Sequence, residues 1–149
     1  MIRTAFLLAL TAVISAVEIS GAFARATAPG QGAAGVFMTV KNPRDQPVEI
    51  TGASSSRAGR VELHRTETGA DGVKRMVHQP SITIPAKGQV VLAPGGLHVM
   101  LLDLTAPLTE GSTIDVDVTL GDGTKVTTPV IVKWAGATEA TAEKPSCCP

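Results

Sequence analysis

Short runs of alternating or β-branched residues recur along this chain of 149 residues, and clusters of turn-forming residues separate them. Such alternation is typical of half-buried strands, and no segment carries a sustained helical stripe. Asn42-Pro43, Asp71-Gly72, Pro94-Gly95-Gly96 and Asp122-Gly123 mark turns. The expected strands are Val17–Ala24, Val36–Lys41, Val48–Ser54, Arg60–Thr66, Val73–His78, Ser81–Ile84, Gln89–Leu92, His98–Leu102, Thr113–Leu120 and Lys125–Lys133. About eight to ten short strands at this spacing predict an all-β fold, a Greek-key β-sandwich or barrel with no major helix.

The N-terminus carries an uncharged, mostly apolar run over residues 5–17. This run is too short to span a bilayer, which takes about 20 apolar residues, but it suits the apolar region of a secretory signal peptide. Residues 22–26 contain two overlapping small-x-small cleavage sites, whereas cleavage after Ala16 keeps the strand-like run Val17–Ser20 on the mature chain. We therefore expect a signal peptide over residues 1–16, cleaved between 16 and 26, and an exported protein with no stable membrane span after cleavage.

The charge balance is even, with 13 Lys and Arg against 13 Asp and Glu, and the chain has one Trp and no Tyr. This balance excludes a strongly basic nucleic-acid binder, because such proteins neutralise phosphates with clustered Lys and Arg. The few aromatic rings also leave little surface on which bases or sugars could stack. The sequence thus predicts no nucleic-acid partner.

The scarce His and Met residues fall on predicted strands. His98-x-Met100 lies in a strand-like segment after the turn Pro94-Gly95-Gly96. Side chains two apart on a strand point to the same face, so one imidazole and one thioether project together.

A second pair comes from a predicted hairpin. If the hairpin pairs around residues 70–71, His64 lies roughly opposite Met76 or Val77, and His78 is also near. The two His/Met pairs could then converge on one ion.

Thioether sulfur is soft and imidazole is borderline, and this combination selects Cu(I) over Ca, Mg or Mn. Zinc more often takes thiolate, carboxylate or more His, and a blue-copper site needs a Cys thiolate. Each residue also has a simpler explanation, because Met commonly fills gaps in cores and a strand His is often at the surface.

The spacing of these residues matches the metal motif of a known family. His64 is followed by Arg65 and ten residues, then by Met76, twenty-one residues and His98-x-Met100. The sequence resembles the PCuAC family of periplasmic copper chaperones, whose motif has this spacing, with Arg65 at an optional Met position. Further matching segments extend the resemblance over residues 17–133: Ala24–Gly30, Gly35–Val40, Gly52–Ser56, Val61–His64, Ile84–Ala86, Pro94–Met100 and Pro107–Gly111.

The resemblance implies a cupredoxin-like domain over residues 17–134 that binds Cu(I) through His64, Met76, His98 and Met100. It implies a periplasmic carrier, not an enzyme, which passes copper to the copper centre of cytochrome c oxidase or to another copper carrier. It also supports cleavage near residue 16. We assign Met38 to the core, and His78, which has no place in the motif, to the surface or to an auxiliary ligand role.

Residues 135–149 are small, polar and proline-containing, and we expect them to form a flexible C-terminal tail. Both cysteines, Cys147 and Cys148, lie there, so no disulfide framework runs through the domain. The pair could capture Cu(I), take part in thiol–disulfide exchange, form an intermolecular link or have no function, and the sequence leaves these roles open.

Two other function classes compete with a copper carrier. One is a metal-free, secreted β-sandwich module for interaction or assembly, in which His and Met are packing residues. The other is an enzyme, but no Ser/His/Asp or Cys/His arrangement with supporting sequence context favours it.

Overall fold

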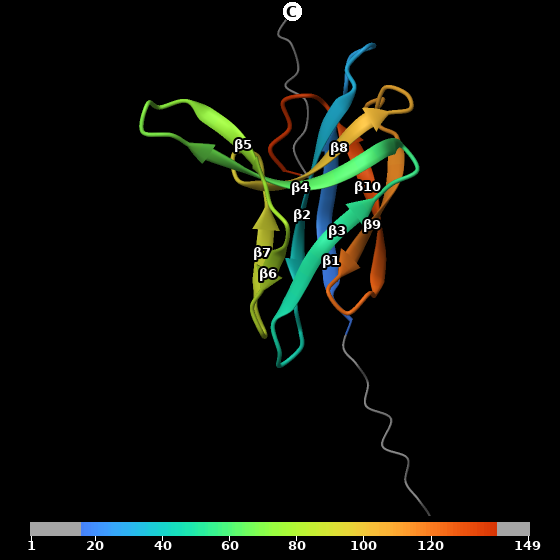
Figure 1. Cartoon of the computed structure of the whole chain (residues 1–149). Helices are drawn as coiled ribbons and strands as arrows, with labels where there is room; N and C mark the ends of the chain where they lie inside the picture. Colours follow the sequence, from blue (N-terminus) through green and yellow to red (C-terminus); the bar gives the residue numbers. More distant parts are fainter. Residues whose placement is uncertain (1–15, 140–149) are drawn as a thin grey trace, which may run out of the picture.

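The computed structural model describes residues 16–139, in which ten β-strands make up the regular structure (Figure 1). The strands are β1 Glu18–Arg25, β2 Ala33–Lys41, β3 Val48–Ser54, β4 Ala58–Thr68, β5 Lys74–His78, β6 Ile82–Ile84, β7 Gln89–Leu92, β8 Leu97–Leu104, β9 Thr113–Leu120 and β10 Lys125–Lys133. The described residues contain no helix, and hence none long and apolar enough to cross a membrane. Most of the expected signal peptide and residues 140–149, with both cysteines, lie outside the described part.

The all-β prediction is confirmed, and each of the ten expected strands is present. The largest shift at a strand end is in β2, which begins at Ala33 rather than Val36. Residues 33–35 are Ala-Ala-Gly, which show no strand-like pattern, but they pair with β8 from Ala33 opposite Leu102 onward. Tertiary pairing therefore extends the strand beyond its local signal.

The strands follow the hydrogen-bonded order β5-β4-β8-β2-β1-β10-β9-β3-β6, and β7 pairs with β2 beside this path. β1 runs parallel to β10, and the other pairs are antiparallel. β5 lies at one end of the order and pairs with β4. Residues 64–78 of this hairpin, here called the β4–β5 arm, project from the side of the sandwich (Figure 1).

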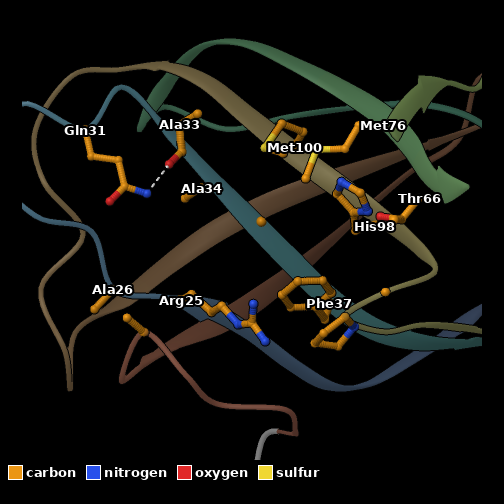
Figure 2. Close-up of a pocket in the computed structure, with 14 residues that line it drawn as sticks. Arg25, Ala26, Gln31, Ala33, Ala34, Phe37, Thr66, Met76, His98 and Met100 are labelled. Carbon is orange, nitrogen blue, oxygen red and sulfur yellow. Dashed lines mark hydrogen bonds between the residues drawn. The ribbon is translucent and has the colours of Figure 1, made fainter. Parts of the chain in front are cut away.

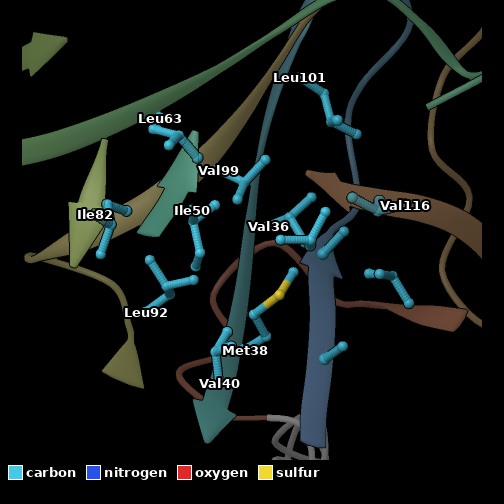
Figure 3. Close-up of a cluster of buried hydrophobic side chains, with 14 of the residues drawn as sticks. Val36, Met38, Val40, Ile50, Leu63, Ile82, Leu92, Val99, Leu101 and Val116 are labelled. Atoms are coloured by element: carbon cyan, nitrogen blue, oxygen red, sulfur yellow. The ribbon is translucent and has the colours of Figure 1, made fainter. Parts of the chain in front are cut away.

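One face of the sheet forms an aliphatic core (Figure 3). The alternation in β2 buries Val36, Met38 and Val40, and the prediction that Met38 is a core residue is confirmed. β8 contributes Val99 and Leu101 to the same core. Burial of each such side chain contributes about 1.5–3 kcal/mol relative to exposure, so this face is the main source of stability.

A smaller cluster lies on the opposite face of β1 and β2. The rings of Phe23 and Phe37 lie 5.2 Å apart and pack with Ala137 and Trp134. The Arg25 Nε donates a 2.9 Å hydrogen bond to the Ala137 carbonyl. The segment from residue 135 was expected to be a flexible tail, but Ala137 is fully buried, so its first residues pack against the domain.

Candidate metal centre

Three imidazoles form a row across β5, β4 and β8. His64 pairs with His98 on one side and with His78 on the other. Two residues before His64, Glu62 pairs with Met100, and two residues after it, Thr66 pairs with Met76, so the two methionines lie on opposite sides of the histidine row. Because residues two apart on a strand share a face, this pairing places all four predicted ligands on one face of the sheet.

The hairpin register differs from the expected one by one to two residues. His64 lies opposite His78, not opposite Met76 or Val77. The cause is the turn, in which the Gly69 amide donates to the Val73 carbonyl. This bond centres the hairpin on residue 71, the later of the two expected centres. Met76 is therefore displaced along the arm from His64, yet it keeps the same face.

His98 is held by the turn that precedes it. Its side chain is almost fully buried, with 3% exposed, and its Nδ1 lies 3.1 Å from the Gly96 carbonyl oxygen. A carbonyl oxygen only accepts, so Nδ1 carries the proton and Nε2 presents a lone pair. That Nε2 is buried and has no hydrogen-bond partner. The same carbonyl accepts a 3.0 Å bond from the Thr66 amide, which ties the turn to β4.

His64 is oriented by a carboxylate. Its Nε2 lies 2.9 Å from Glu62 Oε2, and its Nδ1 is buried without a partner. Because an ionised carboxylate also only accepts, Nε2 carries the proton and Nδ1 presents the lone pair. Buried polar atoms are normally paired, so two unpartnered ring nitrogens on one face are candidates to bind a ligand.

Burial and local bonds set the charge of these groups. Burial lowers the pKa of His98, the bond to Gly96 opposes this, and the nearby His64 lowers the pKa further. The hydrogen bond from His64 lowers the pKa of Glu62. At neutral pH, Glu62 is therefore a carboxylate and His98 is a neutral imidazole. A histidine must be neutral to bind a metal ion, so His98 is in the form that a metal requires.

The two methionines predicted as ligands lie beside His98. Met76 and Met100 line a pocket of about 400 Å³ together with His98, and Figure 2 shows the three along the same part of the pocket. Met76 is 59% exposed, whereas Met100 is partly buried. Gly35 lies opposite Met100 in β2, and a Cβ there would come within 3.0 Å of the Phe37 ring.

The pocket continues away from the donors towards the aromatic cluster. The Arg25 guanidinium lies 5.4 Å from the centre of the Phe37 ring, and that ring lies 6.1 Å from the His98 ring. Arg25, Phe37 and Gln31 line the pocket beside small alanine side chains. Arg25 therefore places a positive charge on this side of the pocket, and none of the described lining residues is Asp or Glu.

His64 and His78 do not line the pocket itself. The His64 ring packs edge-on against His98 at 5.8 Å, and its unpartnered Nδ1 makes it available to an ion held beside His98. The exposed His78 packs edge-on against the other side of His64 at 6.1 Å. Among residues 16–139, no three His, Cys, Asp or Glu side chains form a metal-binding group. The thioethers of Met76 and Met100 are the other soft donors beside His98 in the pocket.

Glu62, Gly96 and Gly35 were not predicted to take part in the site. Glu62 had one usable signal, because it lies two residues before His64 on a strand and must share its face. Gly96 acts through its backbone carbonyl and Gly35 through the lack of a side chain. Neither role has a signature in the residue type alone.

Comparison with known proteins places this geometry in a family. The model of the family described as putative lipoprotein LpqE-like matches residues 17–132. The chain belongs to this LpqE-like family. It is a PCuAC-type family, which confirms the resemblance found in the sequence. A putative lipoprotein of Leifsonia xyli subsp. xyli, Lxx21020, is 39% identical over 125 residues, which cover 83% of this chain and 74% of the relative.

Solved PCuAC structures share the fold of this LpqE-like chain. The apo PCuAC domain of PmoF2 is 25% identical, with a TM-score of 0.68 over 84% of this chain and 95% of that domain. The Cu(I) form of DR1885 from Deinococcus radiodurans is 30% identical, with a TM-score of 0.62 over 87% of this chain and 84% of that protein. A copper-bound form of the PmoF2 domain, 24% identical with a TM-score of 0.68, covers 83% of this chain and 97% of that domain and supports the fold assignment.

Proposed function

We propose that this protein binds one Cu(I) ion through His64, Met76, His98 and Met100 and passes it to a second protein. The proposal rests on two buried ring nitrogens, His64 Nδ1 and His98 Nε2, that have no hydrogen-bond partner. The thioethers of Met76 and Met100 lie in the same pocket as His98. Each histidine is already anchored through its other ring nitrogen, as is usual for metal-bound imidazoles.

The chemistry of the donors supports Cu(I). Two thioethers and two neutral imidazoles carry no charge, and soft sulfur favours Cu(I) over metals that prefer oxygen. Among residues 16–139, no thiolate and no carboxylate lines the pocket, which argues against structural zinc and blue-copper chemistry there. The Cu(I) form of the related DR1885 adds support from a protein that is 30% identical.

The position of Met76 supports transfer rather than permanent storage. This thioether is well exposed on the β4–β5 arm, whereas His98 is buried in β8. An incoming donor can displace the exposed ligand first and then the buried ones. Because the ligands can be replaced one at a time, the ion can be bound tightly and still be released without a large kinetic barrier.

The cellular setting follows from the N-terminal segment and from the relatives. Cleavage of residues 1–16 would release residues 17–134 as a copper-binding domain, followed by residues 135–149 with the cysteine pair. The lipoprotein descriptions of the family and of the Leifsonia relative support export. Within this proposal the protein is a periplasmic, non-enzymatic carrier, and its recipient is the copper-site subunit of cytochrome c oxidase or another copper carrier.

Anaerobic Cu(I) titration against a competing chelator tests the proposal. The mature chain should bind one tight equivalent at the pocket, and the His98→Ala/Met100→Ala variant should lose it. His78→Ala is the matched control, because it removes an imidazole that lies outside the pocket. Undiminished binding by the double variant would refute the site, and weaker binding by His78→Ala would make His78 an auxiliary ligand.

Thermal unfolding separates this proposal from a metal-free interaction module. Specific binding to the native state stabilises it by about 2.7 kcal/mol when the free ion is at 100 times its Kd. A copper carrier must therefore show a melting temperature that rises with free Cu(I). A melting temperature that does not respond to Cu(I) would favour the interaction module.

A further inference from the structure

A chain of charged side chains leads from the surface to His64. Glu62 Oε2 lies 2.9 Å from His64 Nε2, and Glu62 Oε1 lies 3.5 Å from Arg60 Nε. Arg60 Nε in turn lies 3.9 Å from Asp103 Oδ2. Both oxygens of the Glu62 carboxylate therefore have a partner, and the carboxylate is held between a cation and the imidazole.

The two histidines of the site are oriented by different means. His98 is held by the Gly96 carbonyl, and His64 is held by the Glu62 side chain. As a result, they present different ring nitrogens: Nε2 from His98 and Nδ1 from His64. A neutral imidazole exists as two tautomers, and the hydrogen bond made by one nitrogen decides which nitrogen is free to bind a metal.

We infer that Glu62 is a positioning residue that fixes His64 in the tautomer whose Nδ1 binds copper. Without the carboxylate, the proton on Nε2 loses the acceptor that the described structure provides for it. In the other tautomer the proton would sit on the buried Nδ1, which has no acceptor and could no longer donate a lone pair to an ion. The role in copper binding rests on the proposed function, but the control of the tautomer does not.

An incidental surface ion pair is the competing explanation. Two features argue against it. The His64 side chain is only 15% exposed and the Glu62 side chain 26%, so the contact is partly shielded from water. Glu62 also pairs across β4 and β8 with Met100, which places the carboxylate next to a second predicted ligand. The contact is thus built into the donor face.

The test uses two variants of Glu62 with two readouts. Glu62→Gln keeps an oxygen that accepts from Nε2 but removes the charge, and Glu62→Ala removes the acceptor. Glu67→Gln and Glu67→Ala on the same strand are matched controls, because residue 67 lies on the opposite face. The readouts are the tautomer of His64 in the metal-free protein, from ¹⁵N NMR of the ring nitrogens, and the Cu(I) affinity, from chelator competition.

The expected result separates orientation from charge. Glu62→Gln should keep the Nε2–H tautomer and an affinity close to that of the unsubstituted protein. Glu62→Ala should mix the tautomers and weaken Cu(I) binding by about 10- to 100-fold, the usual effect of losing such an outer partner. Both control variants should match the unsubstituted protein.

Three outcomes would overturn the inference. In the first, Glu62→Ala keeps both the tautomer and the affinity. In the second, Glu62→Gln keeps the tautomer but loses as much affinity as Glu62→Ala, which would make charge the cause. In the third, the tautomer changes without any loss of affinity. If the unsubstituted protein binds no Cu(I), the proposed function fails, and the apo NMR spectra still decide whether Glu62 sets the tautomer.

Discussion

The two faces of β8 differ in what they bury. Val99 and Leu101 point into the aliphatic core, whereas His98 and Met100 point to the pocket face. The core face is filled with side chains that need no polar partner. The pocket face contains a hollow of about 400 Å³ and a buried ring nitrogen without a partner.

The difference shows how a small sheet keeps stability and binding apart. Because side chains alternate along a strand, neighbouring residues can serve opposite tasks. An unpaired buried polar atom costs about 1–3 kcal/mol, so the pocket face is destabilising until an ion occupies it. The core face offsets that cost, and substitutions on the two faces should therefore have separable effects.

The largest expected effect is at Leu101, compared with its neighbour Met100. Leu101→Ala should destabilise the protein by about 2–5 kcal/mol in chemical denaturation, because it leaves a cavity in the core. Cu(I) affinity of the folded fraction should stay unchanged. Met100→Ala should do the reverse, with a clear loss of affinity and a smaller loss of stability. Equal loss of affinity in both variants would show that the faces are coupled.

The next effect concerns the space opposite Met100. Gly35→Ala places a Cβ within 3.0 Å of the Phe37 ring, so the ring must shift. Overpacking of this kind costs about 1–3 kcal/mol, and the shifted ring should also weaken Cu(I) binding. Gly32→Ala is the control, because a Cβ there meets nothing within 4 Å. A Gly35→Ala variant as stable and as tight-binding as Gly32→Ala would show that the hollow does not need this glycine.

A matched pair of Met→Leu substitutions compares the faces without changing side-chain volume. Met76→Leu should leave stability within about 0.5 kcal/mol, because Met76 is exposed, but should weaken Cu(I) binding through loss of a thioether. Met38→Leu should cost less than about 1.5 kcal/mol and leave Cu(I) binding intact. Chelator competition and denaturation on both variants check this. If Met38→Leu weakens binding more than Met76→Leu, Met76 is not a ligand.

The smallest expected effect is at the cysteine pair. Cys147→Ser/Cys148→Ser should leave both the stability of the domain and the affinity of the first copper equivalent unchanged. Any further equivalent bound by the unsubstituted chain should disappear. Titration of the two proteins side by side measures this, and a weakened first equivalent would make the thiols part of the pocket site.

The sequence predicts the strands well because their signals are local. Alternation and turn residues locate all ten strands, and the assignment of Met38 to the core is also confirmed. The turn Thr-Gly-Ala-Asp-Gly admits several centres, so the local sequence does not determine the hairpin register. The Gly69–Val73 bond selects one of them.

What the sequence could not provide depends on contacts between distant residues. The parallel pairing of β1 with β10 joins the two ends of the domain. The burial of Ala137 depends on Phe23, Phe37 and Arg25, which lie a hundred or more residues earlier in the chain. The four predicted ligands were identified from family spacing, whereas the ring nitrogen that each histidine presents follows only from Glu62 and Gly96.

The Gly96 carbonyl has a consequence for when copper can be taken up. It accepts from the Thr66 amide and from His98 Nδ1, so a single oxygen joins the pairing of β4 to the orientation of a ligand. An imidazole on an unpaired chain lacks this anchor, and preformed metal sites rarely exist in unfolded proteins. If His98 binds copper as proposed, we therefore expect tight copper uptake only by chains in which this part of the sheet has formed.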